Sequence, residues 1–175
     1  MPNKATREEV ISFTGTEDQD QRRAFEAVGA DRYLAVIKAA VQYYDKDGIK
    51  RPRVHIDATL KEGEDTADTY AKRHVFGDVY IVANSAATQP GMNGRLNGIL
   101  RGFGEAPLSG EAISATIVAT RIADTLNGST AVISVSVEEG QLADEDDPDG
   151  DRKPDRNRID RYLPASNWKV DNESF

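Results

Sequence analysis

The sequence predicts an α+β domain with an antiparallel or mixed sheet of about four strands. One long N-terminal helix and a shorter second helix are expected to pack on it, and an extended C-terminal arm to follow. Three patterns lead to this class. Apolar residues recur at helical spacing within residues 20–46, residues 54–60 alternate between apolar and polar, and residues 140–175 are rich in charge but poor in apolar side chains.

The long helix is predicted from four apolar residues spaced by three and four, namely Leu34, Ile37, Val41 and Tyr44. Asp31 is a suitable N-cap, because its carboxylate can accept a free backbone N–H. Gly48 follows as a C-terminal stop.

Four strands are predicted from alternation, at residues 54–60, 71–82, 112–123 and 130–138. Gly77 interrupts the second strand and suggests a bulge there. The last two strands should form a hairpin, because Asn127 and Gly128 both tolerate positive φ. The second helix is expected over residues 92–103.

Three regions divide the chain: an N-terminal extension at 1–19, the α+β core at 20–140 and the charged arm at 141–175. The arm cannot fill a core of its own, so its large side chains and arginines should dock on a neighbouring molecule. The candidate interface residues are Tyr162, Leu163, Trp168, Phe175, Arg158 and Arg161.

The charge pattern argues against nucleic-acid binding. The net charge is −8, and no basic stripe is present to neutralise phosphates. No stretch is apolar enough to serve as a secretory signal or a membrane span, so we expect no membrane contact and synthesis in the cytoplasm. The chain has no cysteine, which excludes disulfides, thiol nucleophiles and cysteine metal sites.

Alternating acids in the arm suggest a calcium loop. The candidate ligands are Asp147, Asp149, Asp151 and Asp155, with Gly150 placed for a bend. The pattern departs from an EF-hand, because Arg156 stands where the bidentate glutamate belongs. The simpler reading is a solvated acidic linker.

No short catalytic motif is present: the sequence contains no G-x-S-x-G, H-E-x-x-H or P-loop pattern. His55 should face away from the apolar residues that flank it, and a lone strand histidine is usually structural. An alternative reading is nevertheless a small enzyme or ligand-binding domain with a site near His74, Asp78 and the loop at 84–95. A second alternative is a calcium-dependent adhesion module.

Residues 52–62, 73–82 and 120–137 together resemble the tail-terminator and neck proteins of long-tailed phages in the order and character of their elements. The resemblance covers about residues 30–140. It departs from the pattern in the long acidic arm and in residues 1–29, which have no obvious counterpart.

The resemblance implies a structural virion protein and no enzyme. It implies a homo-oligomeric ring, commonly a hexamer, at the junction of head and tail, in contact with tail-tube or connector proteins. DNA would pass through an acidic lumen without specific binding. The resemblance implies no cofactor, and localisation to the virion after assembly in the host cytoplasm.

Overall fold

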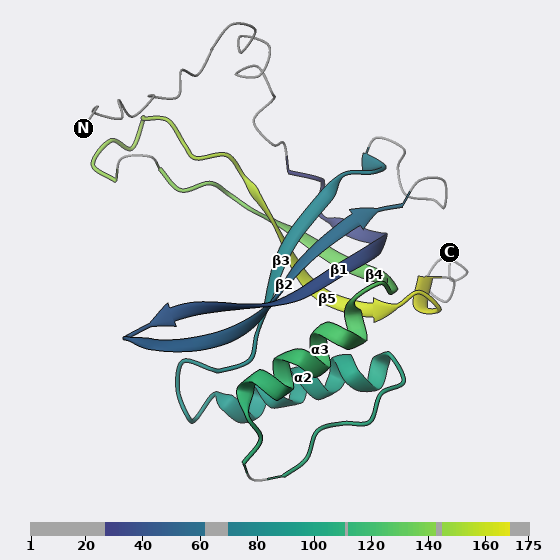
Figure 1. Ribbon diagram of the computed structural model, residues 1–175. Helices are drawn as coiled ribbons and strands as arrows, with labels where there is room; N and C mark the ends of the chain where they lie inside the picture. Colours follow the sequence, from purple (N-terminus) through teal and green to yellow (C-terminus); the bar gives the residue numbers. More distant parts are fainter. Residues whose placement is uncertain (1–26, 62–69, 111, 143–144, 169–175) are drawn as a thin grey trace, which may run out of the picture.

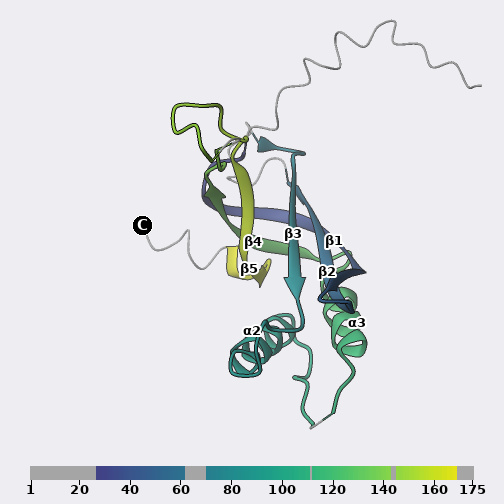
Figure 2. The same cartoon turned by 90° about the vertical axis from the view of Figure 1, so that its left-hand side faces the viewer.

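The computed structural model describes residues 27–61, 70–110, 112–142 and 145–168. Its five strands form one antiparallel sheet in the order β3-β2-β1-β4-β5. Two helices lie at the same end of this sheet (Figures 1 and 2). The elements are β1 (Asp31–Lys46), β2 (Ile49–Leu60), β3 (His74–Tyr80), α2 (Gln89–Gly102), α3 (Ala115–Leu126), β4 (Thr130–Glu138) and β5 (Arg156–Pro164). The α+β class with an antiparallel sheet is therefore confirmed.

The predicted long helix over residues 20–46 is wrong where the structure describes it, because residues 31–46 form strand β1. Tyr33, Ala35 and Ile37 are buried at alternate positions, which is the period of a strand. Asp47 and Gly48 both have positive φ, at 54° and 77°. They close a two-residue hairpin onto β2 instead of ending a helix.

The predicted strand at 112–123 is also wrong. Helix α3 occupies this stretch and buries Ala119, Ile122, Ala123 and Leu126, a spacing of three and four residues. Asn127 and Gly128 therefore join a helix to strand β4, and no hairpin forms there. The helix predicted at 92–103 is confirmed as α2, which begins slightly earlier at Gln89.

The C-terminal region is not a separate arm where it is described. Residues 156–164 form β5, an edge strand paired with β4. Ile159 and Tyr162 point into the core from this strand, and each is only 9% exposed. Asn157 exchanges two hydrogen bonds with the backbone of Val28, at 2.9 Å and 2.8 Å, which ties the start of the described chain to β5.

The sheet curls around its apolar face, so that its two edge strands approach each other. Gly77 on β3 lies against Ile159 and Tyr162 on β5. Gly77 makes no bulge, because the β2–β3 register is continuous past it. The irregularity lies in the β4–β5 pairing, between Ser134 and Val135. The core fills the inside of this curl and is closed at one end by α3.

Two hairpins project from the body (Figure 1). The first is the outer end of β1 and β2, which continues past both neighbouring strands. The second prolongs β4 and β5 through a bridge between Leu142 and Arg152 and a 2.8 Å hydrogen bond from Lys153 N to Gln141 O. No helix in the described ranges is long and apolar enough to cross a membrane.

Candidate functional site

The outer face of β2 and β3 carries two histidine–aspartate pairs. His55 Nδ1 lies 3.0 Å from Asp78 Oδ1, and the other oxygen of Asp78 lies 3.2 Å from Arg53. His74 Nδ1 lies 2.6 Å from Asp57 Oδ1. These residues share one face because the β2–β3 register places His55 opposite Asp78 and strand side chains alternate.

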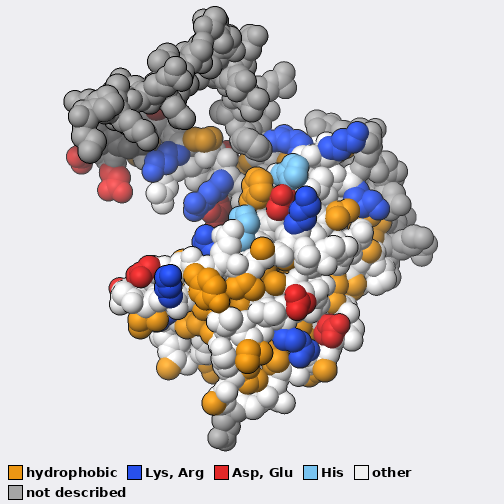
Figure 3. Space-filling view, in the orientation of Figure 1, with side chains coloured by type: hydrophobic (Ala, Val, Ile, Leu, Met, Phe, Trp, Pro, Cys, Tyr) orange, Lys and Arg blue, Asp and Glu red, His pale blue; other side chains and the backbone are white. Residues whose placement is uncertain are grey.

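Phe76 lies between the two histidines and stacks on both. Its ring centroid is 6.1 Å from that of His55 and 6.1 Å from that of His74, with interplanar angles of 11° and 19°. The ring is 49% exposed. Figure 3 shows both histidines, in pale blue, on one open face of the molecule. An open, flat array of this kind suits contact with another surface better than enclosure of a substrate.

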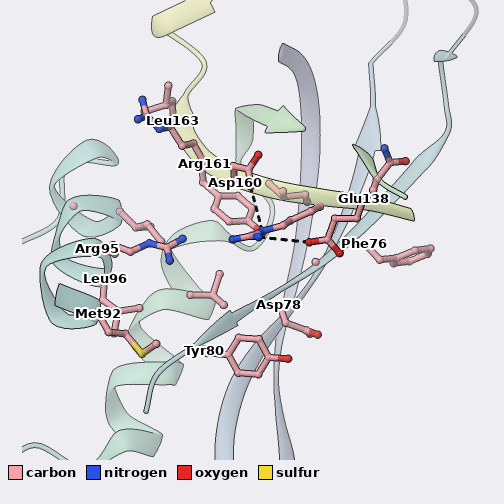
Figure 4. A pocket seen from close by; sticks show the side chains of 18 of the residues that line it. Phe76, Asp78, Tyr80, Met92, Arg95, Leu96, Glu138, Asp160, Arg161 and Leu163 are labelled. Atoms are coloured by element: carbon pink, nitrogen blue, oxygen red, sulfur yellow. Dashed lines mark hydrogen bonds and ion pairs between the residues drawn. The ribbon is translucent and has the colours of Figure 1, made fainter. Parts of the chain in front are cut away.

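A groove runs along the seam between β3 and β5, and helix α2 forms one of its walls. Its volume is about 830 Å³. Figure 4 shows Arg95 reaching in from α2, with Asp78 on the far side and Glu138 and Asp160 above. We call it the seam groove. Its charged lining side chains are Asp78, Arg95, Glu138, Arg156, Arg158, Asp160 and Arg161, and Tyr162 also lines it.

Tyr162 is the most unusual side chain in the seam groove. It is 9% exposed, and its hydroxyl has no hydrogen-bond partner in the described part of the chain. Burial raises the pKa of this phenol above its ordinary value of 10.0, and the nearby Asp78 raises it further, while Arg95 lowers it. The hydroxyl therefore stays protonated and can donate a hydrogen bond that the described residues do not accept.

Positive charge is in excess in the groove, although the whole chain is acidic. Four arginines and three carboxylates line it. The carboxylates are occupied: Glu138 binds Arg156 at 2.9 Å, Asp160 binds Arg158 at 3.2 Å and Asp78 binds Arg53. Within the described residues, neither Arg95 nor Arg161 has an ion pair, so both can bind an added anion.

The predicted enzyme or ligand site is only partly assembled. Asp78 lines the seam groove and Arg95, from the loop predicted at 84–95, reaches it from α2. His74 lies on the outer face with Asp57 and does not line the groove. Residues 84–88 remain a loop, and Asn84 accepts a hydrogen bond from Lys46 on the β1–β2 hairpin.

The candidate calcium ligands lie on the second projecting hairpin. Asp147, Asp149 and Asp151 are exposed at its tip, whereas Asp155 lies on the returning leg and accepts a 2.9 Å hydrogen bond from Gly140 N. No group of three potential metal ligands exists among the residues that the structure describes. Calcium binding here stays a hypothesis.

The candidate interface residues fall into three groups. Tyr162 is buried in the core and Leu163 is half-buried, whereas Arg158 and Arg161 are exposed on β5. Trp168 is half-buried just after β5. Phe175 lies outside the described residues.

A second cavity, of about 320 Å³, lies beside α2. Its amide side chains are engaged: Gln89 binds the backbone of Ile81 and Ala83, and Asn97 exchanges two hydrogen bonds with the backbone of Leu108. These bonds hold the flanking loops in place. We therefore assign this cavity a structural role.

Comparisons of the chain with protein-family models, with curated proteins and with solved structures found no match.

Sequence reasoning missed the seam groove because it forms only when β5 joins the sheet. Arg95 lies in the predicted second helix and Glu138 at the end of a predicted strand, and neither position carries a motif that indicates a groove. The one available signal was Gly77. A glycine inside a strand also marks a place where another group approaches the backbone closely, and that second reading is the one that holds.

Proposed function

We propose that this protein is an assembly subunit that forms a homo-oligomeric ring, and that the ring stands at the head–tail junction of a long-tailed phage. The observation that carries the proposal is the outer end of the β1–β2 hairpin. Subunit contacts made by projecting hairpins and by sheet edges would be its working surfaces, and no reaction is assigned to it.

The β1–β2 hairpin extends beyond the strands on either side of it. Strand β4 pairs with β1 only from Asp31 to Val36, and β3 pairs with β2 only from Arg53 to Thr59. The remainder is a two-stranded ribbon, which is marginally stable in water on its own, and few contacts tie it to the body, among them Tyr43 with Thr116 and Tyr44 with Tyr80. Its apolar tip residues are open to solvent, Ile49 at 57% and Tyr43 at 52%. A neighbouring subunit that covers them would bury this apolar surface and stabilise the ribbon.

The outer strands also favour assembly. Strands β3 and β5 are the two edges of the sheet, and they meet through side chains at Gly77. An edge strand can pair with another chain, and β3 is the edge that favours this, because the exposed arginines of β5 oppose strand pairing. Head-to-tail contacts between different patches of identical subunits generate closed rings when the rotation closes.

The location at a phage neck rests on the resemblance of residues 52–62, 73–82 and 120–137, within which β2, β3 and β4 are strands as expected, together with the charge. A net charge of −8 is compatible with a channel that DNA passes without adhering. Strand β1 and helix α3 depart from the element order expected from that resemblance.

The test is to measure the oligomeric state of the full chain by size-exclusion chromatography with light scattering. We expect a ring-sized oligomer that Ile49→Asp dissociates. Ile117 on α3 is the matched control, because it is equally exposed at 57%, and Ile117→Asp should leave the oligomer intact. Images of the purified oligomer should show a ring with a central channel. A strict monomer would contradict the proposal.

A second candidate function is a small ligand-binding domain, which the seam groove favours. Arg95, which has no ion pair within the described residues, would bind a small anion there. A monomer that gains thermal stability with phosphate or citrate, and loses the gain in Arg95→Ala, would favour this candidate over the ring.

A further inference from the structure

The outer face of β2 and β3 bears four rings, His55, His74, Phe76 and Tyr80, which we call the ring platform. The half-exposed ring of Phe76 stacks on both histidines, at interplanar angles of 11° and 19°. Tyr80 is also exposed and meets Tyr44 edge-on, with ring centroids 5.5 Å apart. Exposed apolar groups that gather on one face and are bordered by polar side chains mark a ligand or interaction site.

Positive charge borders the ring platform, although the whole chain is acidic. Lys38 on β1 and Arg51 on β2 lie on the same face, because the register sets Lys38 opposite Asp57 and strand side chains alternate. Neither cation has an ion pair within the described residues. The two carboxylates of the face, Asp57 and Asp78, are already engaged by the histidines. Figure 3 shows Lys and Arg side chains around both histidines.

Exposed rings beside unpaired cations suit single-stranded nucleic acid. Its free bases stack on aromatic and histidine rings whatever their sequence, and Lys or Arg binds the phosphates between them. A duplex keeps its bases stacked on one another and offers none to the rings. An oligosaccharide would also stack on the rings, but it carries no phosphate for Lys38 and Arg51. Single-stranded nucleic acid is therefore the ligand that uses both features.

The place of the ring platform in the sheet supports the same ligand. The five-stranded sheet curls until its edge strands meet at Gly77, and the β1–β2 and β4–β5 connections project from it (Figure 1). Among five-stranded, partly open barrels is a kind that binds oligonucleotides on the face of its second and third strands. The ring platform lies on the corresponding face here. Exposed acids on the β4–β5 hairpin would repel phosphates, so the β1–β2 hairpin is the one expected to flank a bound strand.

We infer that the outer face of β2 and β3 binds single-stranded nucleic acid, with bases stacked on the ring platform and phosphates held by Lys38 and Arg51. The inference goes beyond the proposed assembly function and does not depend on it, because one subunit supplies the whole platform. It departs from the expectation drawn from the net charge of −8, since that value averages over the chain and does not describe this face.

Fluorescence anisotropy of end-labelled oligothymidylate and oligouridylate tests the inference. Each oligomer is about 20 nucleotides long, which exceeds the roughly 4–16 nucleotides that such barrels cover. We expect binding at about 50 mM salt that weakens as salt is added, because bound phosphates release counterions. Whichever oligomer binds more tightly identifies DNA or RNA as the preferred ligand. A duplex of equal length should bind at least about tenfold more weakly, because its bases cannot stack on the rings.

Variants locate the binding on this face. Phe76→Ala should weaken binding about tenfold, within the range expected for loss of one base–aromatic stack, whereas Phe76→Tyr should retain it. The control Ile117→Ala, at an equally apolar and exposed position on α3, should bind as the wild type does. Arg51→Gln should reduce the slope of log affinity against log salt by about 0.7, and Arg101→Gln, at an exposed position on α2, should not. Circular dichroism checks that each variant is folded.

Three results would overturn the inference. The first is failure to bind either oligomer. The second is binding that Phe76→Ala leaves unchanged, and the third is a duplex that binds as tightly as the single strands, since attraction of phosphates alone would then account for the affinity. The oligomeric state is measured separately by light scattering. A monomer that binds the oligomers would refute the assembly function alone, and a ring that binds neither would refute this inference alone.

Discussion

Gly77 on β3 lies directly against Tyr162 on β5, so that a Cβ built on the glycine would stand 3.1 Å from the phenol oxygen and 3.2 Å from Cδ1 of Ile159. The two residues belong to opposite edges of one sheet, 85 positions apart in the chain. Their contact closes the curl of the sheet and separates the core from the seam groove.

A side chain at Gly77 should therefore force the seam apart. Gly77→Val is expected to cost about 1–3 kcal/mol of unfolding free energy, the usual penalty for overpacking. Urea denaturation followed by circular dichroism measures it. Gly94, on the exposed side of α2 with nothing within 4 Å of a built Cβ, is the control position. Gly94→Ala should stabilise by up to about 1 kcal/mol through helix propensity. If Gly77→Val did not lower the unfolding free energy, the close contact at Gly77 would be disproved.

Loss of the Tyr162 hydroxyl should not destabilise the isolated subunit. The group is buried without a described partner, so Tyr162→Phe removes an unsatisfied polar atom and should raise the unfolding free energy by about 1 kcal/mol. Thermal melting at neutral pH, under conditions in which the protein is monomeric, checks this. A loss of more than that amount would show that the hydroxyl has a partner in solution.

The same tyrosine should make the fold sensitive to alkali. Because the folded pKa of Tyr162 is raised above 10.0, the native state holds its proton at a pH where the unfolded chain has lost it. Stability is then full below pH about 10 and falls as the pH rises above it. Tyr33 adds to the effect, since burial and Asp31 also raise its pKa. Urea denaturation between neutral pH and about pH 11 should show the decline, and Tyr162→Phe should reduce its slope without abolishing it.

The class of the fold could be predicted from the sequence, because the apolar residues of β2, β4 and α2 each follow a single spacing, that of a strand or that of a helix. Strand β1 could not, since its residues satisfy both periods: Leu34, Ile37 and Val41 mark a helical stripe, while Tyr33, Ala35 and Ile37 mark a strand face. The strand forms because β1 pairs with β2 on one side and with β4 on the other. No local sequence pattern indicates that pairing.

The C-terminal region was misread for a different reason. Arg156, Arg158 and Arg161 lie on the solvent side of β5, so charge dominates its composition although Ile159 and Tyr162 are buried. An edge strand tolerates such charge because it protects against unwanted pairing. The seam groove depends on this strand, so it could not be foreseen once residues 141–175 were assigned to an arm.

Variants in the turn between β1 and β2 test whether residues 31–46 form a strand rather than the predicted helix. In a two-residue hairpin loop, Gly48 at φ 77° should resist replacement, because a side chain in that left-handed conformation costs about 1–2 kcal/mol. Gly48→Val should therefore lower stability or fray the hairpin, whereas Asp47→Asn, at φ 54°, should be nearly neutral, since asparagine tolerates the same region. Hydrogen exchange of the β1 amides reports fraying directly. If residues 31–46 were helical, Gly48→Val would affect only a helix end, and exchange along β1 would not change.

Helix α3 can be tested directly against the strand predicted at residues 112–123. A strand would place Ile113, Ile117 and Ala119 on one buried face, but in the helix Ile117 is 57% exposed and Leu126 is fully buried. Leu126→Ala should therefore cost about 2–5 kcal/mol, because it leaves a cavity where α3 closes the core. Ile117→Ala should stay within about 0.5 kcal/mol, as for an exposed side chain. Urea denaturation of both variants distinguishes the helix from the strand. Similar large losses of unfolding free energy would favour the strand, whereas a large loss for Leu126→Ala with a small one for Ile117→Ala follows only from the helix.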